Sequence, residues 1–278
     1  MPPISKYINV NGIRLRYLDW GTRGLPPLIC LHDRTGQAHA WDEFASAMRC
    51  YFHTYAVDVR GHGESGYAMD GYGQDKFVED LATFVDALEL ERCTLAGQSM
   101  GGWHSMLYTA AYPGRVERLV IVDVGPEPSN ESFAPPWIRP ETPMHFVTLQ
   151  DAVDWMRDRD PWASSNRLAK EAHDRMKQST GGWWTWKADP ELFLDHQWDV
   201  SDPVQISRGW NALKSISCPI LEVRGAESTV VSDDILHRMK DAAADLKSVD
   251  VMNAGHLVTV DQPKEFIAVT REFLGATG

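Results

Sequence analysis

Strand-like apolar runs alternate with helical patterns along most of this 278-residue chain. Strands are expected at 6–10, 13–19, 27–31, 53–57, 93–96, 116–123, 220–224 and 248–252, and helices at 41–48, 76–88, 101–112, 233–244 and 264–273. Asn11-Gly12, between the first two strands, indicates a hairpin. Beyond it, strands that alternate with helices form a parallel sheet with helices on both faces. The sequence therefore predicts an α/β fold with a mostly parallel, doubly wound sheet.

This alternation stops between residues 129 and 213, where prolines, amphipathic helical pieces and tryptophans gather. We expect an inserted helical cap at 129–213 over a core formed by 1–128 and 214–278. Most of the chain's 11 tryptophans fall in it, namely Trp137, Trp155, Trp162, Trp183, Trp184, Trp186, Trp198 and Trp210. Large rings can fill the core of a small cap, or some of them can line an apolar or aromatic substrate pocket. The cap also holds six arginines, and one of them could bind a carboxylate.

The pentapeptide Gly97-Gln98-Ser99-Met100-Gly101 lies between an expected strand and an expected helix. This is the G-x-S-x-G pattern in the strand–turn–helix context of a nucleophile elbow. Glycines on both sides leave room for a sharp turn, and the following helix directs backbone N–H groups at the site. The pattern predicts that Ser99 is a nucleophile and that the N–H of Met100 stabilises an oxyanion.

A serine hydroxyl needs a base, and in this type of site the histidine comes late in the chain. His256 follows a short expected strand and Gly255, which suits a turn that presents the ring. We therefore predict that His256 is the base.

Three further segments complete a pattern that resembles the α/β-hydrolase superfamily over residues 6 to 274. Residues 28–32 end a buried strand with His32, which in such proteins opens the oxyanion loop. Residues 58–65 resemble a D-x-R-G-x-G-x-S loop, and 255–266 resemble the C-terminal histidine loop and last helix. The resemblance implies an α/β-hydrolase fold, a serine nucleophile and a second oxyanion donor at the N–H of Arg34.

The triad acid departs from the commonest arrangement of that superfamily. Many relatives carry an aspartate after strand seven, where this chain has Ser228, with Glu227 one residue earlier. Another branch carries the acid after strand six, and Asp123 follows an apolar run at that place. The resemblance therefore implies a Ser99, Asp123 and His256 triad.

The oxyanion loop departs as well, because Asp33 stands where a glycine is usual. A carboxylate near an oxyanion is unfavourable unless it points away or pairs with Arg34. The aspartate could also simply stabilise the turn. We include Asp33 among the candidate substrate-binding residues, with Gln98, Trp183 and Trp186.

The composition limits the classes of binding partner that we expect. The net charge of −12 argues against nucleic acid and anionic membranes, and no run is long enough to span a bilayer. The four cysteines lack metal-like spacing and suggest reduced thiols in the cytoplasm. No P-loop, dinucleotide motif or metal cluster is visible. We expect a small-molecule substrate, no cofactor, no metal, and possibly a homo-oligomer.

These features predict a serine hydrolase that cleaves a carboxylic ester or a lactone through an acyl-enzyme. Three alternatives stay open on the same fold. One is a hydrolase of a carbon–carbon bond in a ring-fission product. The others are a cofactor-free oxygenase of a heteroaromatic compound and a non-enzymatic ligand receptor.

Overall fold

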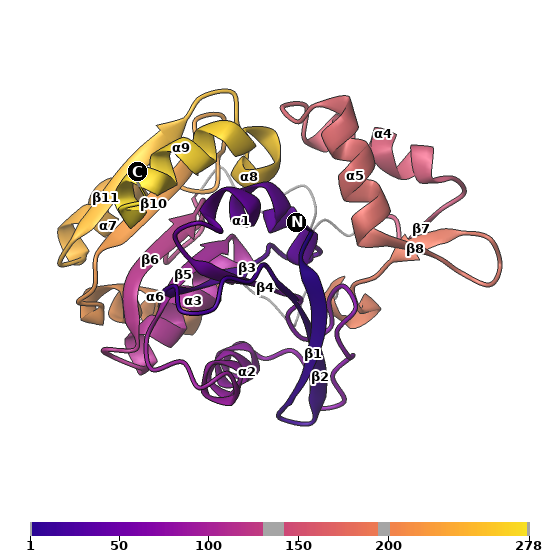
Figure 1. Cartoon of the computed structure of the whole chain (residues 1–278). Helices are drawn as coiled ribbons and strands as arrows, with labels where there is room; N and C mark the ends of the chain where they lie inside the picture. The colour runs from indigo at the N-terminus through magenta and orange to yellow at the C-terminus, as the bar shows by residue number, and fades with distance from the viewer. Residues whose placement is uncertain (1, 130–141, 194–200, 277–278) are drawn as a thin grey trace.

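The computed structural model describes residues 2–129, 142–193 and 201–276, and an eight-stranded sheet forms its centre (Figure 1). The strand order is β1-β2-β4-β3-β5-β6-β10-β11. The strands are β1 (Ile4–Val10), β2 (Ile13–Asp19), β3 (Pro27–Leu31), β4 (His53–Val57), β5 (Cys93–Gln98), β6 (Val116–Val122), β10 (Ile220–Gly225) and β11 (Leu246–Val251). This sheet confirms the predicted α/β fold, and its strands lie within a few residues of the expected ranges.

Only the first part of the sheet is antiparallel. β1 pairs with β2 through a hairpin whose turn, Asn11-Gly12, has positive φ at both residues. β2 pairs antiparallel with β4, and the pairs from β4 to β11 are all parallel. Parallel strands bring their carboxyl ends to one edge, so the loops after β3, β5, β6 and β11 meet there.

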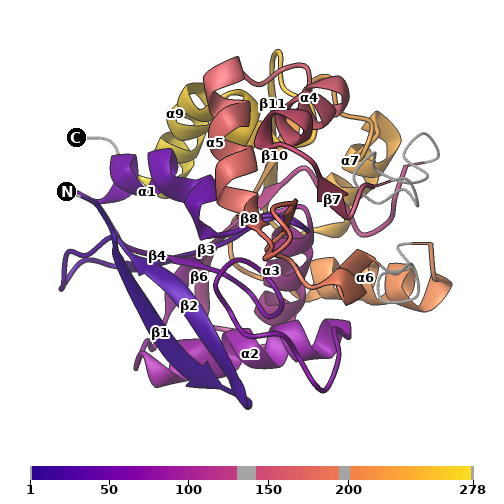
Figure 2. The same ribbon diagram turned by 90° about the vertical axis from the view of Figure 1, so that its right-hand side faces the viewer.

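Helices cover both faces of the sheet (Figures 1 and 2). On one face α1 (Asp42–Met48) packs against α9 (Pro263–Leu274), with the Phe44 and Phe266 rings 5.1 Å apart. The opposite core includes side chains of α2 (Gln74–Ala87), α3 (Met100–Ala111), α6 (Pro203–Ser215) and α7 (Asp233–Ala242). A short helix, α8 (Val258–Asp261), joins the histidine loop to α9. Among the described residues, no helix is long and apolar enough to cross a membrane.

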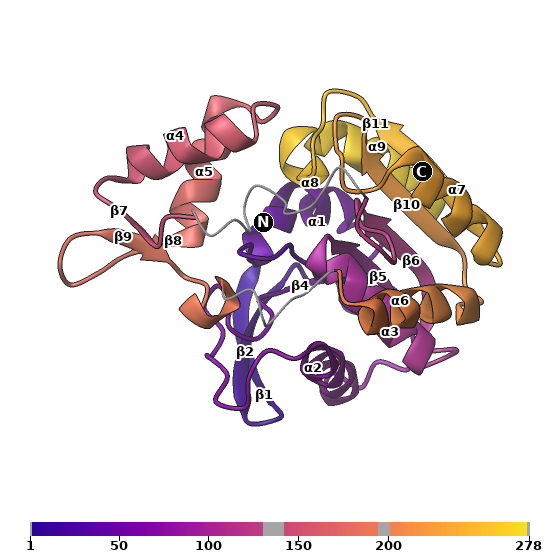
Figure 3. The same cartoon turned by 180° about the vertical axis from the view of Figure 1, so that it is seen from behind.

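The region expected to be a helical cap is partly β-structure. It contains β7 (His145–Phe146), α4 (Leu149–Arg159), α5 (Ser165–Arg175), β8 (Met176–Gln178) and β9 (Trp184–Trp186), and the three strands form a small sheet in the order β7-β9-β8. These elements lie to one side of the main sheet, whereas α6 lies beside α3 (Figure 3). Gly209 of α6 sits so close to the Trp103 ring that a Cβ would collide with it. The insertion expected at 129–213 as a helical cap is thus only partly helical in its described residues, because its middle forms a sheet and its last helix, α6, packs on α3 of the core.

Candidate active site

Ser99 occupies the turn between β5 and α3 with φ 53° and ψ −118°. This left-handed backbone is unfavourable for a residue with a side chain, so the surroundings must hold it. The Ser99 N–H donates to the Val122 carbonyl at 2.9 Å. A Cβ at Gly97 would overlap the Gly101 backbone, and one at Gly101 would overlap the Leu31 carbonyl. The glycines are thus required by close packing as well as by the turn.

A chain of hydrogen bonds links Ser99 to His256 and Asp123. The Ser99 Oγ lies 2.8 Å from His256 Nε2, and His256 Nδ1 lies 2.6 Å from Asp123 Oδ2. The three residues follow β5, β6 and β11, so the parallel sheet brings them to one edge. Asp123 is fully buried and also has a positive φ, 52°. This is the geometry in which a histidine can accept a serine proton while a carboxylate orients the ring.

Ser228 completes the surroundings of Asp123. Its hydroxyl donates to Asp123 Oδ2 at 2.5 Å from the loop after β10, where many relatives carry the acid. Glu222, on the adjacent strand β10, is also fully buried. Burial, followed by the negative charge of Asp123, raises the Glu222 pKa well above its usual value. Sequence reasoning missed Glu222, although an acid inside the apolar strand Ile220–Gly225 was a visible signal.

The loop after β3 is built around a neutral histidine. His32 Nδ1 donates to the Asp33 carbonyl at 2.7 Å, and Nε2 accepts the Val59 N–H at 3.1 Å. Burial lowers the pKa of His32 to about 4, which fits this uncharged arrangement. The side chain of Arg34 donates a hydrogen bond to the Leu192 carbonyl in the cap region.

Asp33 pairs with Arg175 of α5, a partner that the sequence analysis did not consider. Two bonds, Arg175 Nη1 to Asp33 Oδ2 at 2.9 Å and Nη2 to Oδ1 at 3.2 Å, join buried side chains. Arg175 also binds Glu171 at 2.9 Å. Although burial opposes its charge, Asp33 and Glu171 together raise the Arg175 pKa. The pair ties the oxyanion loop to the cap and compensates the charge of Asp33.

The side chain of Gln98 forms hydrogen bonds within the protein. Its amide oxygen accepts bonds from the hydroxyl and the N–H of Thr259, the hydroxyl at 2.5 Å. Its amide nitrogen lies 3.5 Å from the His256 carbonyl. Both amide atoms therefore serve to hold the histidine loop against β5. That Gln98 binds substrate stays a prediction.

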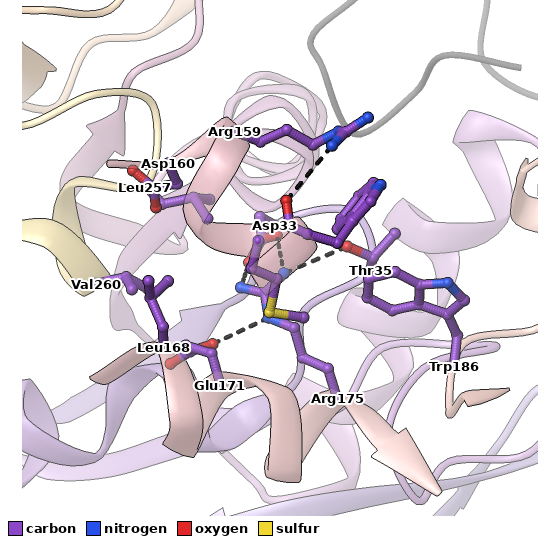
Figure 4. Close-up of a pocket in the computed structure, with 12 residues that line it drawn as sticks. Asp33, Thr35, Arg159, Asp160, Leu168, Glu171, Arg175, Trp186, Leu257 and Val260 are labelled. Carbon is purple, nitrogen blue, oxygen red and sulfur yellow. Dashed lines mark hydrogen bonds and ion pairs between the residues drawn. The ribbon is translucent and has the colours of Figure 1, made fainter. Parts of the chain in front are cut away.

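A cavity of about 40 Å³ lies between the cap and two loops of the core (Figure 4). Its walls come from the oxyanion loop, α4, α5, β9 and the segment after His256. They are formed by Asp33, Thr35, Trp155, Met156, Arg159, Asp160, Leu168, Glu171, Arg175, Trp186, Leu257 and Val260.

Trp186 and Trp183, which were both predicted to bind substrate, lie in different surroundings. Trp186 is 4% exposed, lines the cavity and donates its Nε1–H to the Pro143 carbonyl at 2.7 Å. Trp183 is 44% exposed and packs its ring on His145 at 5.0 Å, away from the cavity walls. Trp155, which the sequence did not single out, takes its place in the wall. Trp137 and Trp198 lie outside the described residues.

An acid pair connects the cap to the histidine loop. Asp160, at the end of α4, shares a hydrogen bond with Asp261 of α8, and both side chains are buried. Asp261 also accepts the Gly255 N–H at 2.8 Å, next to His256. Burial, followed by the charge of Asp160, raises the pKa of Asp261 to about 9. Burial raises the pKa of Asp160 as well, so the pair holds a proton at neutral pH that one carboxyl can donate to the other.

No group of three or more histidine, cysteine or acidic side chains with metal-binding geometry occurs in the described ranges. The arrangement at the sheet edge instead suits chemistry carried by a hydroxyl, an imidazole and a carboxylate.

The sequence profile of the alpha/beta hydrolase family matches residues 28–269. A 3-hydroxybutyrate-oligomer hydrolase of Cupriavidus necator is 27% identical, with 95% of this chain and 94% of that protein covered. An N-formylmaleamate deformylase of Pseudomonas putida is 28% identical, with 96% and 95% covered. The crystal structure of an E-2-(acetamidomethylene)succinate hydrolase has a TM-score of 0.86 at 24% identity, with 98% and 99% covered.

Proposed function

The chain belongs to the alpha/beta hydrolase family, and on that premise we propose that it is a serine hydrolase that cleaves a carboxylic ester or a lactone. The observation that carries the proposal is the hydrogen-bonded chain from Ser99 through His256 to Asp123. Several relatives that match nearly the whole chain are named as hydrolases or esterases, including one named for an oligomer of hydroxybutyrate.

In the proposed reaction Ser99 Oγ attacks the carbonyl carbon as its proton passes to His256 Nε2. Asp123 accepts the Nδ1–H and stabilises the imidazolium. The tetrahedral oxyanion is held by the N–H groups of Met100 and Arg34. His256 then protonates the leaving alcohol oxygen as the C–O bond breaks, leaving an acyl ester on Ser99. A water molecule, deprotonated by His256, releases the acid and restores the serine.

The cavity beneath the cap is our candidate for the substrate pocket. Its wall includes Leu257, which follows the base, and Asp33, which precedes the proposed oxyanion donor Arg34. Trp155 and Trp186 supply an aromatic wall. Such a wall favours an apolar or aromatic portion of the substrate.

A turnover screen tests the proposal. We expect the purified chain to hydrolyse a series of aryl esters and lactones, and Ser99→Ala to abolish this. Ser105→Ala is the matched control, because Ser105 is a buried serine on α3 whose hydroxyl donates to the Gly101 carbonyl. The same screen includes amides, ring-fission products and oxygen uptake with heteroaromatic compounds. Turnover confined to one of those classes, or tight binding without turnover, would reject ester hydrolysis.

A further inference from the structure

One arginine of the cap differs from the other described ones in its lack of a carboxylate partner. Arg157 pairs with Asp154 at 2.8 Å. Arg167 lies 2.9 Å from Glu43 and 3.2 Å from Glu171, and Arg175 binds Asp33 and Glu171. Arg208 pairs with Asp75. Arg139 lies outside the described residues. Within the described part of the chain, Arg159 has no carboxylate partner.

The structure holds the Arg159 guanidinium in place by other means. Its central carbon lies 4.1 Å from the centre of the Trp155 ring, the distance of a cation–π contact. Nη1 reaches the Trp155 carbonyl at 3.4 Å, and the buried Nε has no hydrogen-bond partner. The head group is thus oriented while much of its donor capacity stays unused.

Arg159 belongs to the wall of the cap cavity, on the side opposite Leu168 and Glu171 (Figure 4). The acids of the same wall are already engaged. Asp33 and Glu171 bind Arg175, and Asp160 accepts from Asp261. Of the two arginines in this wall, Arg159 is therefore the one without a carboxylate partner among the described residues. A guanidinium in this position is suited to a carboxylate, which it can bind through two N–H groups.

We propose that Arg159 binds a carboxylate carried by the substrate, so that the preferred ester or lactone has an acidic group on the portion that enters the cap cavity. Trp155 and Trp186, whose rings lie 5.8 Å apart, pack on the carbon chain between that group and the scissile carbonyl. This inference rests on the proposed ester hydrolysis for its kinetic test, but the anion site can be tested without turnover.

The kinetic test compares the p-nitrophenyl monoester of adipic acid with p-nitrophenyl hexanoate, which has the same chain without the charge. We expect the wild type to prefer the acidic ester in kcat/KM. Arg159→Met keeps an aliphatic stem over Trp155 but removes the charge. It should raise KM for the acidic ester by roughly tenfold or more, the scale of a lost charge-assisted hydrogen bond, and leave the neutral ester nearly unchanged. Arg159→Lys should retain part of the preference.

Arg157→Met is the matched control, because Arg157 lies on the same helix but is half-exposed and paired with Asp154. It should keep the preference. Equal kcat/KM for both esters in the wild type, or an unchanged preference in Arg159→Met, would overturn the proposal. Circular dichroism checks that each variant is folded, and Arg159→Gln replaces Arg159→Met if the latter is not.

Binding provides the second readout. Adipate should quench or shift the tryptophan fluorescence of the Ser99→Ala variant, and adipamide should not. Arg159→Met in the same background should lose this response, whereas Arg157→Met should keep it. Adipate binding that depends on Arg159 in a protein without esterase activity would support the anion site and reject the hydrolase proposal. Ester turnover without Arg159-dependent adipate binding would support the hydrolase proposal and reject the anion site.

Discussion

Asp123 ends β6 with a left-handed backbone and gives one carboxylate oxygen to two partners, His256 and Ser228. Ser228 thus stands after β10, where many relatives carry the triad acid, and donates a hydrogen bond to Asp123, which follows β6. Glu227, the neighbour of Ser228, is exposed. At the scale of single residues, this arrangement assigns the orienting of His256 to Asp123.

The first prediction separates these two acids. Asp123→Asn should lower kcat by up to about 10⁴, because the amide no longer stabilises the imidazolium and favours the wrong ring tautomer. Glu227→Gln should stay within about tenfold of the wild type, the scale of one modest interaction. Steady-state kinetics and far-ultraviolet circular dichroism of both variants decide between them. Full activity in Asp123→Asn, or loss of activity in Glu227→Gln alone, would mean that the triad acid lies in the loop after β10 instead.

At the scale of elements, α4 of the cap meets α8 of the core through the Asp160–Asp261 hydrogen bond. Asp261 keeps its proton in the folded protein up to a pKa of about 9, whereas in the unfolded chain it loses the proton near its ordinary value of 3.8. The proton therefore stabilises the fold at low pH, and this contribution falls as the pH rises from about 4 to about 9.

We predict that Asp261→Asn flattens this part of the pH dependence. Asparagine can still donate to Asp160 and accept from the Gly255 N–H, but it has no proton to lose. Relative to the wild type, its free energy of unfolding should improve between pH 5 and pH 8, with a ceiling of about 1.4 kcal/mol per pH unit. Urea unfolding at both pH values measures this. Asp158→Asn, at an exposed position of α4, is the control. Parallel pH profiles for the wild type and Asp261→Asn would contradict the account.

The small cap sheet presents its tryptophans to different surroundings, which leads to a further prediction. Trp186→Phe should alter KM or the preferred acyl length, because Trp186 lines the cavity. Trp183→Ala should leave kinetics unchanged and stability within about 0.5 kcal/mol, as is usual for an exposed site. Ester-series kinetics and thermal melts of both variants test this. A kinetic effect of Trp183 alone would place the substrate on the outer face of the cap.

At the scale of the whole molecule, the sequence predicted the parallel sheet and the meeting of Ser99, Asp123 and His256. Each of these residues follows an expected strand, and parallel strands bring their carboxyl ends to one edge. The cap was harder to predict, because its β7-β9-β8 sheet consists of two- and three-residue strands, too short for a periodic pattern.

Long-range polar pairs could not be predicted. Asp33 and Arg175 are far apart in the sequence, and their contact depends on how α5 lies over the oxyanion loop. Asp160, which follows α4, and Asp261, the last residue of α8, likewise interact although they lie far apart in the sequence. Nothing in the local residue pattern fixes the partner of a single charged side chain.

The central claim is that Ser99 is a nucleophile activated by His256, and covalent labelling tests it most directly. Treatment of the folded protein with a fluorophosphonate should modify Ser99, because the activated hydroxyl attacks electrophilic phosphorus and displaces fluoride. Peptide mass spectrometry should find the adduct on Ser99, with none on Ser105 or Ser228, and Ser99→Ala should remain unlabelled. A folded protein whose Ser99 peptide carries no adduct would contradict the account.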